Sequence, residues 1–341
     1  MMKNIIYILK NSLCIVLGGM LLSSCTKNLP TDRLSIANDS QYLIYEYKPI
    51  LGRNTLFSNN FQYGNSSRPL DFKIVNMRGF NGEAAVELTE KYPVLVWKTA
   101  YDGTEKSIAQ IEAKRVLENH PLFEVRPHSG EFIMWAAANS NVVKAQPDSG
   151  YVFDVEMSNS GGRKYFQNFR LRPFRERPYE PSNWDPVTGQ GTNESVNVTS
   201  VNMTGERGQP IGTGDVQVSF RSTSGSGNSL TFKFVDSLSN PINPENFAKT
   251  DWQNLVHGFN MTKSSTMVKY DVAYPIPCSS YPTKYTTLSG TQARAVFRFD
   301  RIGFGNVRQE CHLALNFNIY KKGDWEITFA FKRDKPKFDN D

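Results

Sequence analysis

Residues 151–162 read Tyr-Val-Phe-Asp-Val-Glu-Met-Ser-Asn-Ser-Gly-Gly. Apolar side chains recur at every second position up to Met157, which is the period of a strand with one buried face. The Asn-Ser-Gly-Gly cluster that follows contains residues that adopt positive φ, and the chain then returns through residues 165–171. These residues predict an antiparallel β-hairpin.

The same period of two recurs on both sides of this hairpin. It appears at residues 70–74 and again in six runs of the C-terminal half, and turn residues separate the runs. Because this arrangement is typical of β-sandwiches, we predict an all-β protein with two antiparallel, immunoglobulin-like β-sandwich domains, at 46–174 and 211–341. The six runs are Val216–Phe220, Leu230–Phe234, Val268–Val272, Ala293–Phe299, Cys311–Ile319 and Trp325–Phe331.

One short helix is expected inside the first domain. Ser107 and Gln110 have the spacing of a capping box, and His120-Pro121 would end the helix. A helical turn is also expected near Pro244 to Val256. The apolar side of the first helix would consist of Ile108, Ile111, Val116 and Leu117.

Residues 175–210 lie between the two domains and are rich in Pro, Asn, Gly and Thr, which predicts an irregular linker that contributes to the interdomain face. The prolines near its start lack the amide hydrogen that a strand ladder needs. Tyr179 and Trp184 stand out here, because no strand alternation predicts their burial. Either Trp184 fills the seam between the domains, or it projects with Tyr179 as a stacking platform for a ligand.

The first 24 residues carry Lys3 and Lys10, no acidic residue, and an apolar run at 13–22. A positive segment followed by a short apolar segment is typical of a signal peptide, and about ten apolar residues are too few to span a membrane. Leu-Ser-Ser-Cys at 22–25 then resembles the lipobox of bacterial lipoproteins, whose cysteine is acylated. We therefore expect a signal peptide at 1–24, lipid on Cys25, and a tether over 25–45.

The lipobox resemblance implies that lipid on Cys25 holds the protein on an envelope membrane, with the outer membrane favoured. Surface-exported lipoproteins of the Bacteroidota often carry acidic residues after the cysteine, whereas Thr-Lys-Asn-Leu-Pro follows here. The cell surface and the periplasmic face both remain open.

Charge argues against a nucleic-acid partner. The chain has 39 basic and 33 acidic residues, and loss of Lys3 and Lys10 with the signal peptide would leave 37 against 33, a net charge of +4. These charges are interspersed along the predicted strands and form no basic run.

Two cysteines, Cys278 and Cys311, would remain in the mature chain, because Cys14 leaves with the signal peptide and Cys25 is lipidated. An oxidising envelope permits a disulfide. Cys311, however, belongs to an alternating run that places it on a buried face, where a free cysteine behaves as a small apolar residue. We favour two free thiols and keep the disulfide as the alternative.

No catalytic or metal-binding motif is apparent, such as HExxH, GxSxG or CxxC, so we expect no cofactor, no metal and no enzymatic activity. A hydrolase whose carboxylates lie on the polar faces of strands is the alternative. Asp236-Ser237-Leu238 resembles a short O-glycosylation acceptor, which makes Ser237 a candidate for modification. The histidines are far apart in sequence and are expected to be structural: His120, His128, His257 and His312.

Three segments of the first half resemble cadherin-like and bacterial immunoglobulin-like sandwiches. They are residues 70–76, 123–132 and 151–159, which in such domains form an early core strand, a strand-turn-strand unit and the last hairpin. The turn reads Pro-His-Ser-Gly, and the acidic calcium ligands of cadherins are absent. The resemblance therefore implies the fold without calcium.

The mature chain is also similar to a Bacteroidota lipoprotein family known as domain of unknown function number five thousand and seven. Residues 174–189, 256–261 and 270–277 carry most of this resemblance. It implies genomic company with SusC-like and SusD-like outer-membrane uptake proteins and no established activity.

Two functions fit these observations. In the first, the protein is an accessory lipoprotein of a SusC/SusD-type uptake system that captures glycans with aromatic side chains. In the second, it is a structural or adhesive lipoprotein that contacts other envelope proteins.

Overall fold

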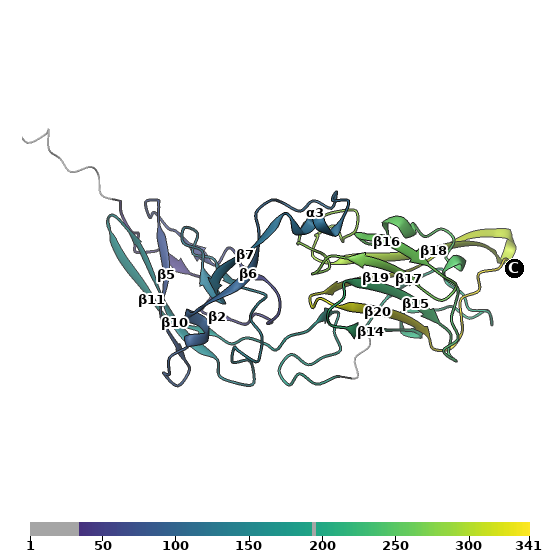
Figure 1. The fold of residues 1–341 in the computed structure, drawn as a ribbon, viewed down its shortest axis with the longest axis horizontal. Helices are drawn as coiled ribbons and strands as arrows, with labels where there is room; N and C mark the ends of the chain where they lie inside the picture. The colour runs from purple at the N-terminus through teal and green to yellow at the C-terminus, as the bar shows by residue number, and fades with distance from the viewer. Residues whose placement is uncertain (1–33, 193–195) are drawn as a thin grey trace, which may run out of the picture.

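The computed structural model describes residues 34–192 and 196–341, so Cys25 and the expected signal peptide lie outside the described residues. Figure 1 shows the strands gathered in two groups that lie end to end. We call the group from β1 to β11 the N-terminal lobe and the group from β12 to β20 the C-terminal lobe. The protein is nearly all β, as predicted, and no helix of the described part is long and apolar enough to cross a membrane.

The N-terminal lobe is built on a four-stranded sheet with the order β2-β11-β10-β5. Its central hairpin pairs Tyr151 with Leu171 and Asn159 with Gly162, which confirms the predicted turn. A smaller sheet has the order β3-β9-β8. The strands of the two sheets are β2 (Glu46–Tyr47), β3 (Thr55–Phe57), β5 (Asp71–Gly79), β8 (Phe123–Val125), β9 (Phe132–Met134), β10 (Tyr151–Asn159) and β11 (Gly162–Leu171).

Aromatic rings fill the core between these sheets. Phe132 of β9 and Phe153 of β10 are fully buried, with ring centroids 5.4 Å apart. Tyr42 also lies in this core, although it belongs to the expected tether. It is part of β1 (Gln41–Tyr42), which pairs with β4 (Phe61–Gln62). The tether prediction is therefore wrong for these residues, because a two-residue strand is too short for its period to show in the sequence.

The predicted helix begins where the sequence places it. Helix α3 (Ile108–Glu112) has Ser107 as its N-cap, and the Ser107 hydroxyl accepts the N–H of Gln110 at 3.2 Å. The cap therefore satisfies one of the amides that the first turn leaves unpaired. A second short helix, α2 (Val86–Thr89), was not predicted.

The helix prediction is wrong after α3. Val116 and Leu117, which were expected on its apolar side, lie in strand β7 (Arg115–Pro121). This strand pairs in antiparallel register with β6 (Lys91–Trp97). Strand pairing prevails over the helical spacing because the β6 backbone satisfies the hydrogen bonds of this segment.

The C-terminal lobe is a sandwich of two sheets. One sheet has the order β14-β20-β15-β17-β16, and the other contains β12-β19-β13 with β18 also paired to β19. Phe232 and Phe297, one from each sheet, are fully buried with ring centroids 5.5 Å apart. The six predicted strands are present, in β14 (Val216–Ser224), β15 (Ser229–Val235), β17 (Val268–Val272), β18 (Ala293–Gly303), β19 (Val307–Ile319) and β20 (Asp324–Phe331), and β16 (Gly258–Lys263) is added to them.

Two further features of the fold differ in detail from the predictions. The expected helical turn near residues 244–256 appears as two short 3-10 turns, η2 (Pro244–Asn246) and η3 (Trp252–Asn254). Two strand pairs, β2 with β11 and β15 with β20, are parallel. The sandwiches are therefore not purely antiparallel.

The Pro-rich segment is more ordered than predicted. Strand β12 (Tyr179–Glu180) pairs with Ile319 and Asn318 of β19, and β13 (Thr199–Val201) pairs with the same strand. The prediction that the prolines exclude a ladder here is wrong, because a two-residue strand fits between Pro178 and Pro181.

Candidate functional site

A long arm connects the two lobes. It comprises β6, α3 and β7, residues 91–121, and Figure 1 shows it rising from the N-terminal lobe so that α3 lies over the near end of the C-terminal lobe. Within the described residues β6 and β7 pair only with each other. The position of the arm therefore depends on side-chain contacts, at its base, where Val94 belongs to a buried cluster with Ile133 and Trp135, and at its tip.

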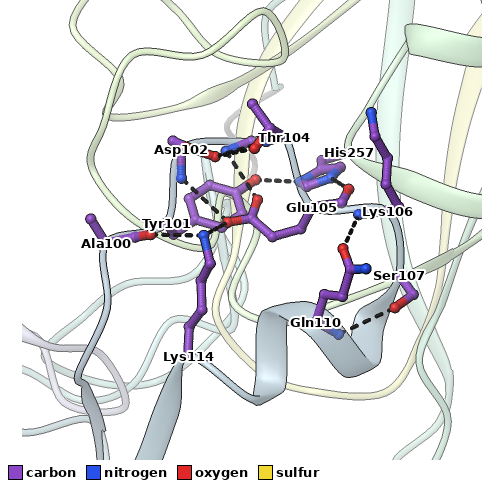
Figure 2. Close-up of polar contacts among 11 residues, drawn as sticks. Ala100, Tyr101, Asp102, Thr104, Glu105, Lys106, Ser107, Gln110, Lys114 and His257 are labelled. Atoms are coloured by element: carbon purple, nitrogen blue, oxygen red, sulfur yellow. Dashed lines mark hydrogen bonds and ion pairs between the residues drawn. The ribbon is translucent and has the colours of Figure 1, made fainter.

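The tip of the arm binds the C-terminal lobe through a histidine. In Figure 2, Tyr101 of the arm points toward His257, and its hydroxyl lies 2.5 Å from Nδ1. The other ring nitrogen, Nε2, lies 2.9 Å from the backbone carbonyl oxygen of Glu105. A carbonyl only accepts hydrogen bonds, so Nε2 carries the proton and Nδ1 accepts from the Tyr101 hydroxyl. Burial lowers the pKa of His257, which favours this neutral form.

A buried carboxylate holds the loop behind Tyr101. Glu105 is only 5% exposed and forms an ion pair with Lys114 (Figure 2). Burial acts to raise the pKa of Glu105, but the bond to Lys114 and backbone donors outweigh it and lower that pKa. Gly103 in this loop has a φ of 79°, and a Cβ there would lie 2.9 Å from Thr283 of the C-terminal lobe. Glycine therefore permits both the turn and the close approach.

Arg115 makes the second contact of the arm. Its side chain donates a hydrogen bond of 2.8 Å to the carbonyl of Tyr274 and forms an ion pair with Glu112. The guanidinium carbon also lies 5.2 Å from the ring centroid of Trp97, within the range of a cation–π contact. Ile111 of the arm and Ala273 of the C-terminal lobe belong to one small buried apolar cluster. The arm is thus anchored by polar bonds around a small apolar cluster.

A separate contact joins the lobes beside the Pro-rich segment. Arg53 of the N-terminal lobe lies 3.8 Å above the ring centroid of Tyr320. Its guanidinium donates to the carbonyl of Arg177 and to a carboxylate oxygen of Glu180, each at 3.2 Å. The lobes therefore touch both at the arm and at Arg53.

A cleft of about 820 Å³ is bordered by both contacts. Side chains of both lobes and of the arm contribute to its wall, which mixes apolar, aromatic, amide and charged groups. Pockets that bind small molecules have volumes of about 300–1,000 Å³ and often lie between domains. The lining includes Arg53, Asn54, Leu56, Leu95, Trp97, Ile108, Glu112, Arg115, Asn228, Tyr274, Ser280, Asn318, Tyr320 and Lys322.

A cysteine and a histidine lie near the cleft without the features of a nucleophilic pair. Cys278 is a free thiol and borders the same small cavity as His257 and Tyr101. Burial raises the pKa of Cys278 to about 12, so the thiol stays protonated and unreactive at neutral pH. The Nδ1 of His257 is occupied by the Tyr101 hydroxyl. The second cysteine, Cys311, is also free, and is buried in the C-terminal core.

The structure separates the two aromatic residues singled out in the Pro-rich segment. Tyr179 is 6% exposed and stacks on Phe220, with ring centroids 4.5 Å apart. This burial leaves Tyr179 no open face, so it does not project as a platform. Trp184 is 42% exposed and is not among the residues that line the cleft. It therefore does not fill the seam, and it remains a candidate for stacking only by itself.

The other predicted residues have varied surroundings. Ser237 is exposed in a turn beside Asp236, whose carboxylate accepts backbone N–H groups, so its hydroxyl is accessible. His120 lies between the carboxylates of Glu118 and Glu124. Within the described residues, no group of three or more His, Cys, Asp or Glu side chains is arranged so that it could hold a metal ion.

Sequence reasoning missed the cleft, because its wall comes from segments that lie far apart along the chain. Trp97 and Arg115 border it from the arm, whereas Tyr274 and Lys322 come from the C-terminal lobe. One signal was available. The segment 270–277, which carries part of the family resemblance, contributes to the wall, and the similar segment 256–261 contains His257.

Comparison with known proteins agrees with that resemblance. A family model described as Domain of unknown function (DUF5007) matches residues 61–340, a range that includes the arm, its contacts with the C-terminal lobe and the cleft lining from Leu95 onward. No curated protein matches the chain. Because the matched range covers far more than half of the sequence, the chain belongs to the DUF5007 family.

Proposed function

We propose that this protein is a membrane-anchored envelope lipoprotein that captures a glycan or glycoconjugate in the cleft between its lobes, as an accessory component of a SusC/SusD-type uptake system. The cleft carries the proposal. At about 820 Å³ it is large enough for a short oligosaccharide, and both lobes contribute to its wall.

The chemistry of the wall suits sugars. The uncovered part of the half-buried Trp97 ring offers a flat apolar surface to the apolar face of a sugar ring. Asn54 and Asn228 supply amide groups, which donate and accept hydrogen bonds as sugar hydroxyls require. Binding rather than catalysis fits this mixture, since the nearest thiol is held protonated.

The proposed location rests on the sequence. Leu-Ser-Ser-Cys at 22–25 follows a positive segment and a short apolar segment, the arrangement of a lipoprotein signal. Changing Cys25 to Ala should abolish labelling with palmitate and release the protein from membrane fractions. Continued labelling of the variant would refute lipidation at this residue.

A glycan array with the chain from residue 26, which keeps every described residue, tests the binding proposal. Ser280 is an exposed residue of the cleft wall, so Ser280→Trp should fill the cleft without disturbing a core. Ser265→Trp, in an exposed turn outside the lining, is the matched control. We expect Ser280→Trp to lose the bound glycans and Ser265→Trp to retain them.

Two outcomes would refute this proposal. Either no glycan or glycoconjugate of a broad array binds the protein, or Ser280→Trp binds as well as the parent. The second outcome would place the ligand outside the cleft.

One observation favours the alternative of a structural or adhesive lipoprotein. Leu117 of the arm is 69% exposed, and its neighbours Val116 and Leu95 are also exposed, which gives this hairpin an unusual apolar surface. A pull-down from envelope extracts with the parent and with Leu117→Lys distinguishes the two functions. A partner that requires Leu117, with no glycan bound on the array, would favour adhesion.

A further inference from the structure

The charges of the cleft wall are unbalanced. Three of its lining residues are cationic, namely Arg53, Arg115 and Lys322, and only Glu112 is anionic. Glu112 is already committed to Arg115, because its two carboxylate oxygens accept from the Nε and a terminal nitrogen of that guanidinium. The excess positive charge of the lining therefore lies at Arg53 and Lys322.

Beside Arg53, two guanidinium groups share one carboxylate. Glu180 accepts from Arg53 at 3.2 Å and from Arg177 at 3.3 Å. The Nε atoms of both arginines are buried without a hydrogen-bond partner among the described residues. The hydrogen-bonding capacity of this pair therefore exceeds what Glu180 supplies.

Lys322 adds a third positive charge, and no carboxylate of the described residues pairs with it. Its side chain is exposed at the cleft wall and has neither an ion pair nor a hydrogen bond in the described parts of the chain. Two carboxylates of neighbouring segments, Asp324 two residues after Lys322 and Glu176 beside Gly52, have other partners. Asp324 accepts from the hydroxyl and N–H of Ser229, and Glu176 accepts the N–H of Ser140.

We propose that the cleft binds acidic glycans, with a carboxylate or sulfate group of the sugar held between Arg53 and Lys322. This inference rests on the proposed function and specifies its ligand class. A guanidinium and an ammonium are the groups that proteins use to bind such anions, and a partly enclosed cleft strengthens the attraction. The sugar rings would then extend toward Trp97, which also lines the cleft.

Matched ligands test the acidic group directly. The first pair is tetragalacturonate and its fully methyl-esterified form, which differ in the charge of the carboxyl groups. The second pair is a sulfated oligosaccharide and its unsulfated parent, which separates sulfate from carboxylate as the recognised group. Calorimetric titration of the chain from residue 26 should show binding of at least one acidic member about tenfold or more tighter than its neutral partner.

Two neighbouring lysines provide the protein controls. Lys322→Glu reverses the charge in the cleft wall, and Lys321→Glu makes the same change at an exposed residue outside the lining. Lys322→Glu should weaken the acidic ligand about tenfold or more and leave a neutral ligand unchanged. Lys321→Glu should change the affinity for either ligand by no more than about twofold, which is the size expected for a screened surface charge.

The outcomes separate this inference from the function on which it rests. If neutral glycans bind as tightly as their acidic partners, the preference for acidic glycans is refuted. The proposal that the cleft binds glycans is then unaffected. Equal losses of affinity for the acidic ligand in Lys321→Glu and Lys322→Glu would show that only the general surface charge matters. This result would also refute the anion site between Arg53 and Lys322. Failure of every glycan to bind would refute both proposals.

Discussion

The hairpin of β18 with β19 and the hairpin of β6 with β7 are both antiparallel and rich in apolar residues, yet they have opposite surroundings. In the first, every second residue of β18 is buried, and Phe297 is fully enclosed. In the second, Leu95 pairs with Leu117 and both are exposed. Alternation thus indicates a strand, but only the neighbouring sheet determines whether its apolar face is covered.

The two hairpins also have different roles in forming the cleft. The buried hairpin completes the C-terminal sandwich. The exposed hairpin extends from the N-terminal lobe and places Tyr101 and Arg115 in contact with the C-terminal lobe. Hydrogen bonds and ion pairs, rather than a large core, hold the tip of the arm in place. The wall of the cleft therefore depends on a polar contact.

The largest expected contrast is in stability. Phe297→Ala in β18 should lower the free energy of unfolding by about 3–5 kcal/mol, because it leaves a cavity in a closed core. Leu117→Ala in β7 should change it by no more than about 0.5 kcal/mol, since the side chain is already in contact with water. Urea unfolding of both variants measures the difference. Similar losses in the two would show that the arm is packed more tightly than its exposure indicates.

Removal of the Arg115 side chain should have an intermediate effect on the free energy of unfolding. Arg115→Ala leaves the carbonyl of Tyr274 without its donor, at an expected cost of about 1–3 kcal/mol. Lys98→Ala is the control, because its ion pair with Glu118 is exposed and is worth about 0–1 kcal/mol. Limited proteolysis within residues 98–114 should be faster in Arg115→Ala only. Equal cleavage in both variants would mean that Arg115 does not anchor the arm.

The docking of the arm should also depend on pH. Burial depresses the pKa of docked His257 below its ordinary value of 6.5, and Lys284 and Lys106 act in the same direction. Undocked His257 therefore takes up a proton first, so docking is complete above pH 6.5 and weakens as the pH falls below it. Hydrogen-exchange protection of residues 101–105 should decrease between about pH 7.5 and 5.5.

Two histidine variants check that prediction. His257→Gln should remove the pH dependence of protection at residues 101–105. His120→Gln should retain it. Burial opposes the charge on His120, but bonds to Glu118 and Glu124 outweigh it and raise its pKa, so His120 contributes stability that is lost as the pH rises. Unchanged pH dependence in His257→Gln would refute the role of His257 in the pH-dependent docking of the arm.

The smallest effect is expected at Trp184. Because its side chain is 42% exposed and lies outside the cleft lining, Trp184→Ala should change the free energy of unfolding by about 0.5 kcal/mol or less. It should also leave glycan binding in the cleft unchanged. Loss of binding on a glycan array would restore Trp184 as a stacking residue.

The strands could be predicted from sequence because a buried sheet face imposes a local period of two. This was sufficient for the 151–171 hairpin and for the six runs between Val216 and Phe331. It failed for Val116 and Leu117, since their spacing also fits a helix and only pairing with β6 decides between them. It also failed for Tyr42, whose strand has two residues.

The cleft could not be predicted in this way. Its wall depends on Arg53 meeting Tyr320 and on Tyr101 meeting His257, pairs separated by more than 150 positions along the chain in each case. No periodicity links such residues. Only the family resemblance at 256–261 and 270–277 marked the segments that the arm touches.

Hydrogen-exchange mapping of the mature chain with and without its bound glycan would locate the ligand between the lobes or elsewhere. If the cleft binds it, protection should rise together at residues 52–56 and 95–97 of the N-terminal side and at 273–280 and 318–322 of the C-terminal lobe. These four segments all contribute to the lining of one space. Protection confined to one lobe, or to segments outside the lining, would contradict a binding site in the interlobe cleft.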